Sequence, residues 1–263
     1  MEDVFARARS DERAVLVGYL PAGYPTVAGA IEALTSMVDS GVDVVEIGLP
    51  YTDPLIDGPT IQTAVDRALA GGVRTRDVLA TVEAVAGTGV PTLVMTYWNP
   101  VDAYGVERFA RDLAAAGGAG MITPDLIPEE AADWLAASDA AALDRIFLVA
   151  PSSTDQRIAM TTAHCRGFVY AASVMGVTGA REASSTLGRR LVERVRAASD
   201  LPVGVGLGVS NGRQAAEVAA YADAVIVGSA LVGCLLHAES DVAGVRALRA
   251  LTADLAAGVR RDG

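Results

Sequence analysis

The chain has 263 residues, of which 51% are hydrophobic and 20% are charged. This composition can build a large core and excludes intrinsic disorder. The net charge of -11 argues against binding to nucleic acid or to anionic membranes. All 21 basic residues are arginines, and the lack of lysine excludes a Schiff base, a pyridoxal phosphate anchor and a Walker-type phosphate loop.

The histidines and cysteines do not have the spacing of a metal site. His164 and Cys165 are adjacent, and no CxxC or HxxxH pattern occurs. Two cysteines in a chain of this length indicate a reducing compartment. The first ten residues are too polar for a signal peptide, and no apolar run reaches ~18 residues. We therefore expect a cytoplasmic protein with no metal and no membrane span.

Short apolar segments rich in β-branched residues alternate with amphipathic segments along the whole chain. The expected strands are Ala14–Leu20, Val42–Leu49, Pro91–Thr96, Gly120–Thr123, Arg145–Val149, Gly167–Ala171, Pro202–Val205 and Ala224–Val227. The expected helices are Val4–Arg9, Thr26–Ser40, Thr60–Ala70, Arg76–Gly87, Val106–Ala116, Pro128–Ala137, Thr154–Cys165, Leu187–Ala198, Asn211–Ala220, a short one after Gly228, and Val242–Ala257.

This alternation predicts βαβ units and a parallel sheet that is buried on both faces. Eight such units in about 250 residues fit a closed (β/α)8 TIM barrel better than an open sheet. No G-x-G-x-x-G fingerprint of a dinucleotide-binding fold follows the first strand. With no linker or low-complexity segment, residues 1–263 are expected to form one domain. A functional site is then expected at the C-terminal ends of the strands.

Glu46 is the only charged residue in the apolar run from Val44 to Leu49. Strand alternation places it on the same face as Val44 and Gly48, which would point into the barrel. Burial raises the pKa of a carboxyl, and a raised pKa suits a general acid or base. The alternative is a structural glutamate paired with an arginine.

The loop that follows contains a second candidate carboxylate, Asp57. It lies eleven residues after Glu46, far enough for the loop to fold back over the barrel mouth. The alternative is that Asp57 only caps the helix that begins near Pro59.

Three glycine clusters follow the sixth, seventh and eighth expected strands. Backbone N–H groups and a helix N-terminus can bind phosphate there without any lysine. The alternative is that the glycines only form tight turns. The clusters are Gly176-Val177-Thr178-Gly179, Gly206-Leu207-Gly208 and Gly228-Ser229-Ala230.

The sixth strand and the segment after it add two further features. Tyr170 shares a strand face with Phe168, and the alternative is that one of the two rings only fills the barrel. The polar, glycine-bounded segment that contains Thr178 and Arg181 is typical of a mobile lid.

Taken together, these motifs resemble the alpha subunit of tryptophan synthase over nearly the whole chain. Most specific is the strand motif with Glu46 followed by Asp57-Gly58-Pro59. The motifs are Gly18-Tyr19-Leu20-Pro21-Ala22-Gly23-Tyr24-Pro25, Val45-Glu46-Ile47-Gly48-Leu49-Pro50-Tyr51-Thr52-Asp53-Pro54, Asp57-Gly58-Pro59-Thr60-Ile61-Gln62, Met95-Thr96-Tyr97-Trp98-Asn99-Pro100, Pro124-Asp125-Leu126, Gly176-Val177-Thr178-Gly179 and Gly228-Ser229-Ala230.

The resemblance implies a (β/α)8 barrel that cleaves indole-3-glycerol phosphate to indole and glyceraldehyde 3-phosphate. It implies no cofactor in this chain and a pyridoxal-phosphate beta subunit as partner in an alpha2beta2 tetramer. By resemblance, each candidate residue takes a role: catalytic for Glu46, Asp57 and Tyr170; phosphate-binding for Gly179, Gly208, Gly228 and Ser229; partner-facing for Asp53 and Asn99. Tyr19 stands where a phenylalanine lines the indole pocket in some members.

The residues themselves fit this chemistry. Without lysine the enzyme cannot form an imine, so a retro-aldol substrate must act as its own electron sink. Indole does so once its C3 is protonated. Glu46 suits that proton transfer, and Asp57 suits the indole N–H. Alternatives left open are a stand-alone indole-releasing lyase, a phosphosugar isomerase and a non-catalytic activator of a beta subunit.

Overall fold

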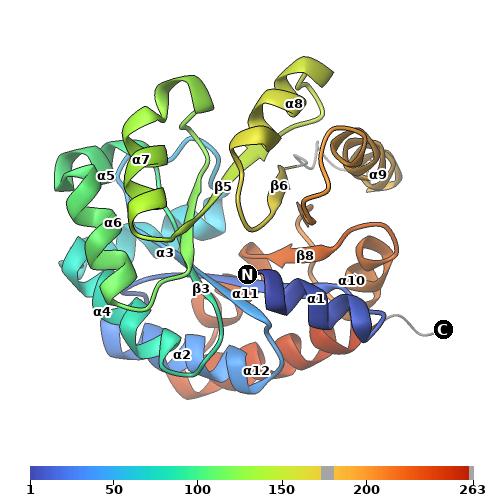
Figure 1. Cartoon of the computed structure of the whole chain (residues 1–263). Helices are drawn as coiled ribbons and strands as arrows, with labels where there is room; N and C mark the ends of the chain where they lie inside the picture. Colours follow the sequence, from blue (N-terminus) through green and yellow to red (C-terminus); the bar gives the residue numbers. More distant parts are fainter. Residues whose placement is uncertain (173–180, 261–263) are drawn as a thin grey trace.

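Eight parallel strands form a closed barrel in chain order, and β8 pairs with β1. The computed structural model describes residues 1–172 and 181–260, and of residues 181–185 it describes the backbone only. The predicted (β/α)8 barrel is confirmed (Figure 1). The strands are β1 (Val15–Pro21), β2 (Val44–Gly48), β3 (Thr92–Met95), β4 (Gly120–Thr123), β5 (Asp144–Val149), β6 (Val169–Ala172), β7 (Val203–Gly206) and β8 (Ala224–Val227).

Helices surround the barrel and join its strands (Figure 1). In the described ranges, no helix is long and apolar enough to cross a membrane. The helices are α1 (Glu2–Ser10), α2 (Val27–Asp39), α3 (Pro59–Ala70), α4 (Thr75–Ala86), α5 (Trp98–Tyr104), α6 (Val106–Ala115), the 3-10 turn η1 (Pro128–Glu130), α7 (Ala132–Ala140), α8 (Asp155–His164), α9 (Arg181–Arg196), α10 (Gly212–Ala219), α11 (Ser229–Leu236) and α12 (Asp241–Gly258).

Strand alternation divides the core into an inner and an outer part. Val44 of β2 belongs to the cluster inside the barrel, together with Ile122 and Phe168. Val45 and Ile47 belong to the larger cluster between strands and helices. This is the two-residue periodicity that places Glu46 on the inner face.

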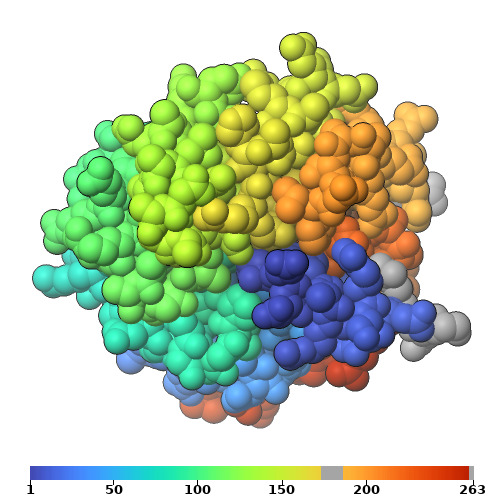
Figure 2. All heavy atoms as spheres, viewed as in Figure 1, coloured from blue at the N-terminus to red at the C-terminus, as the bar shows by residue number. Residues whose placement is uncertain are grey.

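Helix α1 closes the barrel at the N-terminal ends of the strands. Its Phe5 packs against Phe168, which directly precedes β6, with ring centroids 5.8 Å apart, and both belong to the inner cluster. Figure 2 shows α1, in dark blue, covering this face. This leaves the opposite, C-terminal ends of the strands as the expected place of a functional site.

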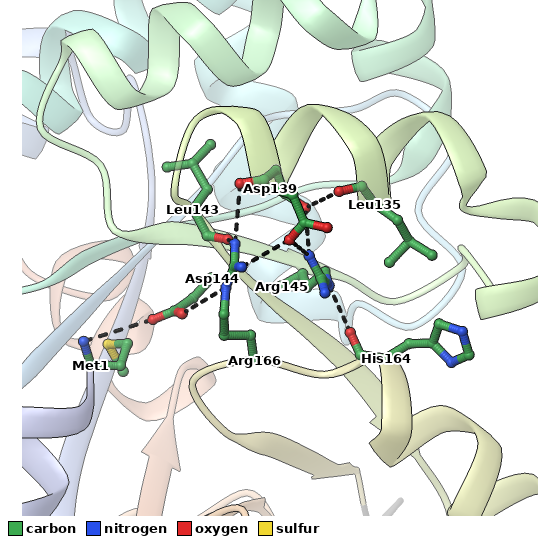
Figure 3. A network of polar contacts seen from close by, with 9 residues as sticks. Met1, Leu135, Asp139, Leu143, Asp144, Arg145, His164 and Arg166 are labelled. Atoms are coloured by element: carbon green, nitrogen blue, oxygen red, sulfur yellow. Dashed lines mark hydrogen bonds and ion pairs between the residues drawn. The ribbon is translucent and has the colours of Figure 1, made fainter.

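A polar network also stabilises this closed end (Figure 3). Arg166 donates to Asp139 of α7 at 2.9 Å and lies 3.5 Å from Asp144, the first residue of β5. Arg145 donates to the same Asp139 carboxylate and to the backbone oxygen of His164 at 2.8 Å. The network joins α7, β5 and the end of α8, and at this end of a TIM barrel such contacts serve stability.

Several expected helix boundaries are wrong. The segment Pro128–Ala137 is split into the turn η1 and helix α7. Helix α9 begins at Arg181, six residues before the expected Leu187, so Arg181 stands at a helix start. Helix α5 was not expected at all; its first N–H, from Trp98, binds the carboxylate of Asp125 on another loop, a contact that local sequence does not show.

Candidate active site

Glu46 lies inside the barrel on β2 with 1% of its surface exposed. Burial, with a smaller contribution from the charge of Asp57, raises the pKa of Glu46 to about 8. Its Oε2 has no hydrogen-bond partner among the described residues, and none of the ion pairs between them involves Glu46. The alternative of a structural glutamate paired with arginine therefore has no support here.

Asp57 lies on the loop between β2 and α3, partly buried. Gly58, not Asp57, is the N-cap of α3, and no side chain caps that helix. The capping alternative is therefore wrong. Burial raises the pKa of Asp57, and a hydrogen bond from the Tyr97 side chain opposes this rise. Asp57 lies close enough to Glu46 for its charge to raise the pKa of Glu46.

Tyr170 of β6 belongs to the same site. Burial raises the pKa of Tyr170 well above its usual value, and the charges of Glu46 and Asp57 raise it further. A side chain at Gly206 would lie 2.8 Å from the Tyr170 hydroxyl, so the ring needs a glycine on the neighbouring strand. The structure thus brings together the three side chains that the sequence nominated as catalytic.

Two further tyrosines lie at this site: Tyr19, which the resemblance places at a pocket position, and Tyr97, which the sequence did not assign. Tyr19 of β1 is in register with Glu46, and burial raises the pKa of Tyr19, with added contributions from Asp57 and Glu46. Tyr97, just after β3, is 5% exposed and contacts the loop that carries Asp57. Both tyrosines lie near the C-terminal ends of their strands, where the residues of a TIM-barrel site are found. Their position in the predicted strands could therefore have indicated them.

The described part of the expected phosphate site lies after β7 and β8. Gly208 has a φ of +66°, a conformation that favours glycine. Gly228 is the N-cap of α11 and Ser229 its first residue. The backbone N–H of Val232 donates to the carbonyl of Gly228, which begins the hydrogen bonds of α11. The N–H groups of the residues between them precede this first bond, and such groups at a helix N-terminus can bind an anion.

The remaining predicted residues are placed as follows. Thr178 and Gly179 lie outside the described residues, and the side chain of Arg181 is not described. Asp53 is exposed on the loop after β2, and Asn99 is exposed in the first turn of α5. The Asn99 amide donates to the Tyr51 hydroxyl at 3.3 Å, so the start of α5 touches the loop after β2. Asp53 accepts a hydrogen bond from Thr52, which also fits the alternative of a residue that stabilises its own turn.

Large apolar side chains are exposed beside Asp53. Leu55 is 76% exposed and Ile56 is 52% exposed. Ile127, on the loop after β4, is 42% exposed. Exposed apolar side chains gathered at one end of a barrel are typical of a surface that binds another protein. Among the described residues, no group of three histidine, cysteine or acidic side chains could hold a metal ion.

Comparison with known proteins identifies the family of this chain. The family model for the tryptophan synthase alpha chain matches residues 5–260. The alpha chain from Salinispora arenicola is 66% identical over 256 residues, covering 97% of this chain and 96% of that protein. The alpha chain from Nocardia farcinica is 61% identical over 260 residues, covering 99% and 96%. A structure of Mycobacterium tuberculosis tryptophan synthase superposes with a TM-score of 0.91 at 60% identity, covering 98% and 97% of the two chains. This chain belongs to the tryptophan synthase alpha chain family.

Proposed function

We propose that this lyase catalyses the alpha reaction, the cleavage of indole-3-glycerol phosphate to indole and glyceraldehyde 3-phosphate, with Glu46 and Asp57 as its proton-transfer groups. One observation carries these roles: two carboxyls share the C-terminal mouth of the barrel, and the pKa of one is raised to about 8. Family membership favours this lyase reaction over a phosphosugar isomerase.

The reaction breaks the bond between indole C3 and the glycerol carbon that bears a hydroxyl. With a pKa of about 8, Glu46 holds a proton at neutral pH and can deliver it to C3. The ionised Glu46 then takes the proton from the hydroxyl as the aldehyde forms, and the bonding electrons return to the indole ring. Asp57 accepts the indole N–H and stabilises the positive charge that C3 protonation creates.

Asp57→Asn tests this assignment. The amide keeps the size of the side chain but cannot carry the negative charge, so we expect turnover to fall by about 10²- to 10⁴-fold. Asp66→Asn, on the exposed face of α3, is the matched control and should cleave substrate at the wild-type rate. Cleavage of indole-3-glycerol phosphate is measured with a beta subunit present. An Asp57→Asn enzyme that keeps wild-type turnover would show that the assignment is wrong.

The family implies a beta subunit as the partner, and that subunit carries the pyridoxal phosphate, while the alpha chain needs no cofactor. We propose an alpha2beta2 assembly in which the surface formed by Asp53, Leu55, Ile56, Asn99 and Ile127 faces the beta subunit. Three of these residues lie on the loop of Asp57, so docking would also order the catalytic carboxylate. Indole, small and neutral, would pass directly to the second active site. The cytoplasmic location stays a prediction.

Titration with a beta subunit tests this coupling. Wild-type cleavage should rise as beta subunit is added, whereas Asp53→Ala should be activated less, because the loop loses a contact with the partner. Asp11→Ala, at the closed end of the barrel and 53% exposed, is the control and should be activated like wild type. Binding and activation of Asp53→Ala at wild-type levels would support the turn-stabilising alternative, and the absence of any complex with wild type would favour a stand-alone lyase.

A further inference from the structure

Tyr97 has no role in the mechanism above, yet its hydroxyl lies against the loop that carries Asp57. The hydroxyl accepts the backbone N–H of Leu55 at 3.0 Å and of Ile56 at 3.1 Å. The same hydroxyl lies close enough to the Asp57 carboxyl to lower the pKa of Asp57. A phenol oxygen has two acceptor positions and one proton. The two backbone N–H groups occupy both acceptor positions, which leaves the proton of the hydroxyl for Asp57.

We infer that Tyr97 is a positioning residue, which fixes the loop of Asp57 through two backbone N–H groups and orients the Asp57 carboxylate with its proton. The inference rests on the proposed function of Asp57. Leu55 and Ile56 directly precede Asp57, and their exposed side chains do not anchor the loop to the core. The Tyr97 hydroxyl therefore supplies an anchor that the loop's own apolar side chains do not.

Tyr97 can serve as an anchor because its own position is held from both sides. Its ring packs on Tyr51, with centroids 5.5 Å apart. The next residue, Trp98, donates its N–H to both oxygens of Asp125, at 2.9 and 3.2 Å. Asn99 donates to Tyr51 at 3.3 Å. Tyr97 thus contacts the loop after β2, and the next residue, Trp98, contacts the loop after β4. Asn99, in the first turn of α5, adds a further contact to the loop after β2.

Tyr97→Phe removes the hydroxyl and keeps the ring on Tyr51. We expect kcat/KM for indole-3-glycerol phosphate to fall by about 10- to 100-fold, because small displacements of a catalytic group have effects of this size. Tyr104→Phe is the matched control: its hydroxyl also donates to an aspartate, Asp112 at 2.8 Å, on the outer helices. That variant should keep wild-type kcat/KM.

The pH dependence separates positioning from a general loss of structure. The Tyr97 hydrogen bond lowers the pKa of Asp57, so its loss moves that pKa upward. Because Asp57 acts as an anion, the acidic limb of the kcat/KM profile should move to higher pH in Tyr97→Phe and stay in place in Tyr104→Phe. A carboxyl NMR titration of Asp57 measures the same shift without relying on activity.

A double-mutant cycle with Asp57→Asn completes the test. If Tyr97 acts through Asp57, Tyr97→Phe should have little further effect on the residual activity of Asp57→Asn. An equal loss in both backgrounds, or a wild-type rate and pH profile for Tyr97→Phe, would overturn the inference while leaving the proposed function intact. Wild-type turnover of Asp57→Asn itself would instead overturn the proposed function, and the inference with it.

Discussion

Glu46→Gln is expected to lose about 10²- to 10⁴-fold of turnover, because the amide can neither donate nor accept the proton that the reaction moves. The same substitution should stabilise the fold at alkaline pH. Glu46 is 1% exposed, and its Oε2 has no partner among the described residues. Burying a neutral glutamine here costs less free energy than burying a carboxylate. Glu46 therefore serves catalysis and lowers the stability of the fold.

The sign of the pH effect follows from the two pKa values. The pKa of Glu46 is raised from 4.5 to about 8 in the folded chain. Between these values the folded state binds more protons than the unfolded state, so the free energy of unfolding falls as pH rises from about 4.5 to about 8. One pKa unit corresponds to about 1.4 kcal/mol. Glu46→Gln should thus be more stable than wild type by a few kcal/mol at pH 8, and equally stable below pH 4.5 as far as this group is concerned.

Thermal unfolding at a series of pH values measures this difference. For a chain of this size, each kcal/mol shifts the Tm by about 2–4 °C. Glu32→Gln, exposed on α2, removes the same charge from the surface and is the control, with no such pH-dependent gain. If Glu46→Gln has the wild-type Tm at pH 8, then Glu46 is not held protonated in the barrel. If it keeps near-wild-type turnover, the catalytic assignment is wrong.

The barrel could be predicted from the sequence because each of its units is a local signal. Every strand is a short apolar run, and in parallel strands that are buried on both faces such runs stand out from the helices between them. Glu46 could be found for the same reason, since a charged residue is unusual in an apolar strand that is buried on both faces. Its predicted raised pKa is confirmed.

The role of Tyr97 could not be predicted in this way. Its hydroxyl binds backbone groups that lie 42 and 41 residues earlier in the chain. Helix α5 depends in the same way on Asp125, which lies 27 residues after Trp98. Neither of these contacts joins residues at a spacing that a local sequence pattern would reveal. Sequence patterns locate the carboxylates that perform the chemistry, whereas the contacts that orient them appear only when neighbouring loops meet.

Gly228→Asp should raise the KM for indole-3-glycerol phosphate strongly, on the order of 10²-fold, because it places a negative charge beside the proposed phosphate position. Gly228 is the N-cap of α11. Its φ of -123° is one that any residue adopts, and a Cβ there would lie 3.3 Å from the ring of Tyr19. The backbone therefore tolerates a side chain after a small shift of that ring, and the main effect is on the anion.

Gly233→Asp is the matched control for this substitution. It adds the same charge to the same helix, further from its N-terminus, and a Cβ there would have no contact closer than 3.6 Å. Its KM should stay near the wild-type value. Indole glycerol without the phosphate separates charge repulsion from damage to the fold: wild type and Gly228→Asp should then react equally poorly. If Gly228→Asp is much worse than wild type on this substrate too, it has distorted the site around Tyr19, and the loops after β7 and β8 are not shown to bind phosphate.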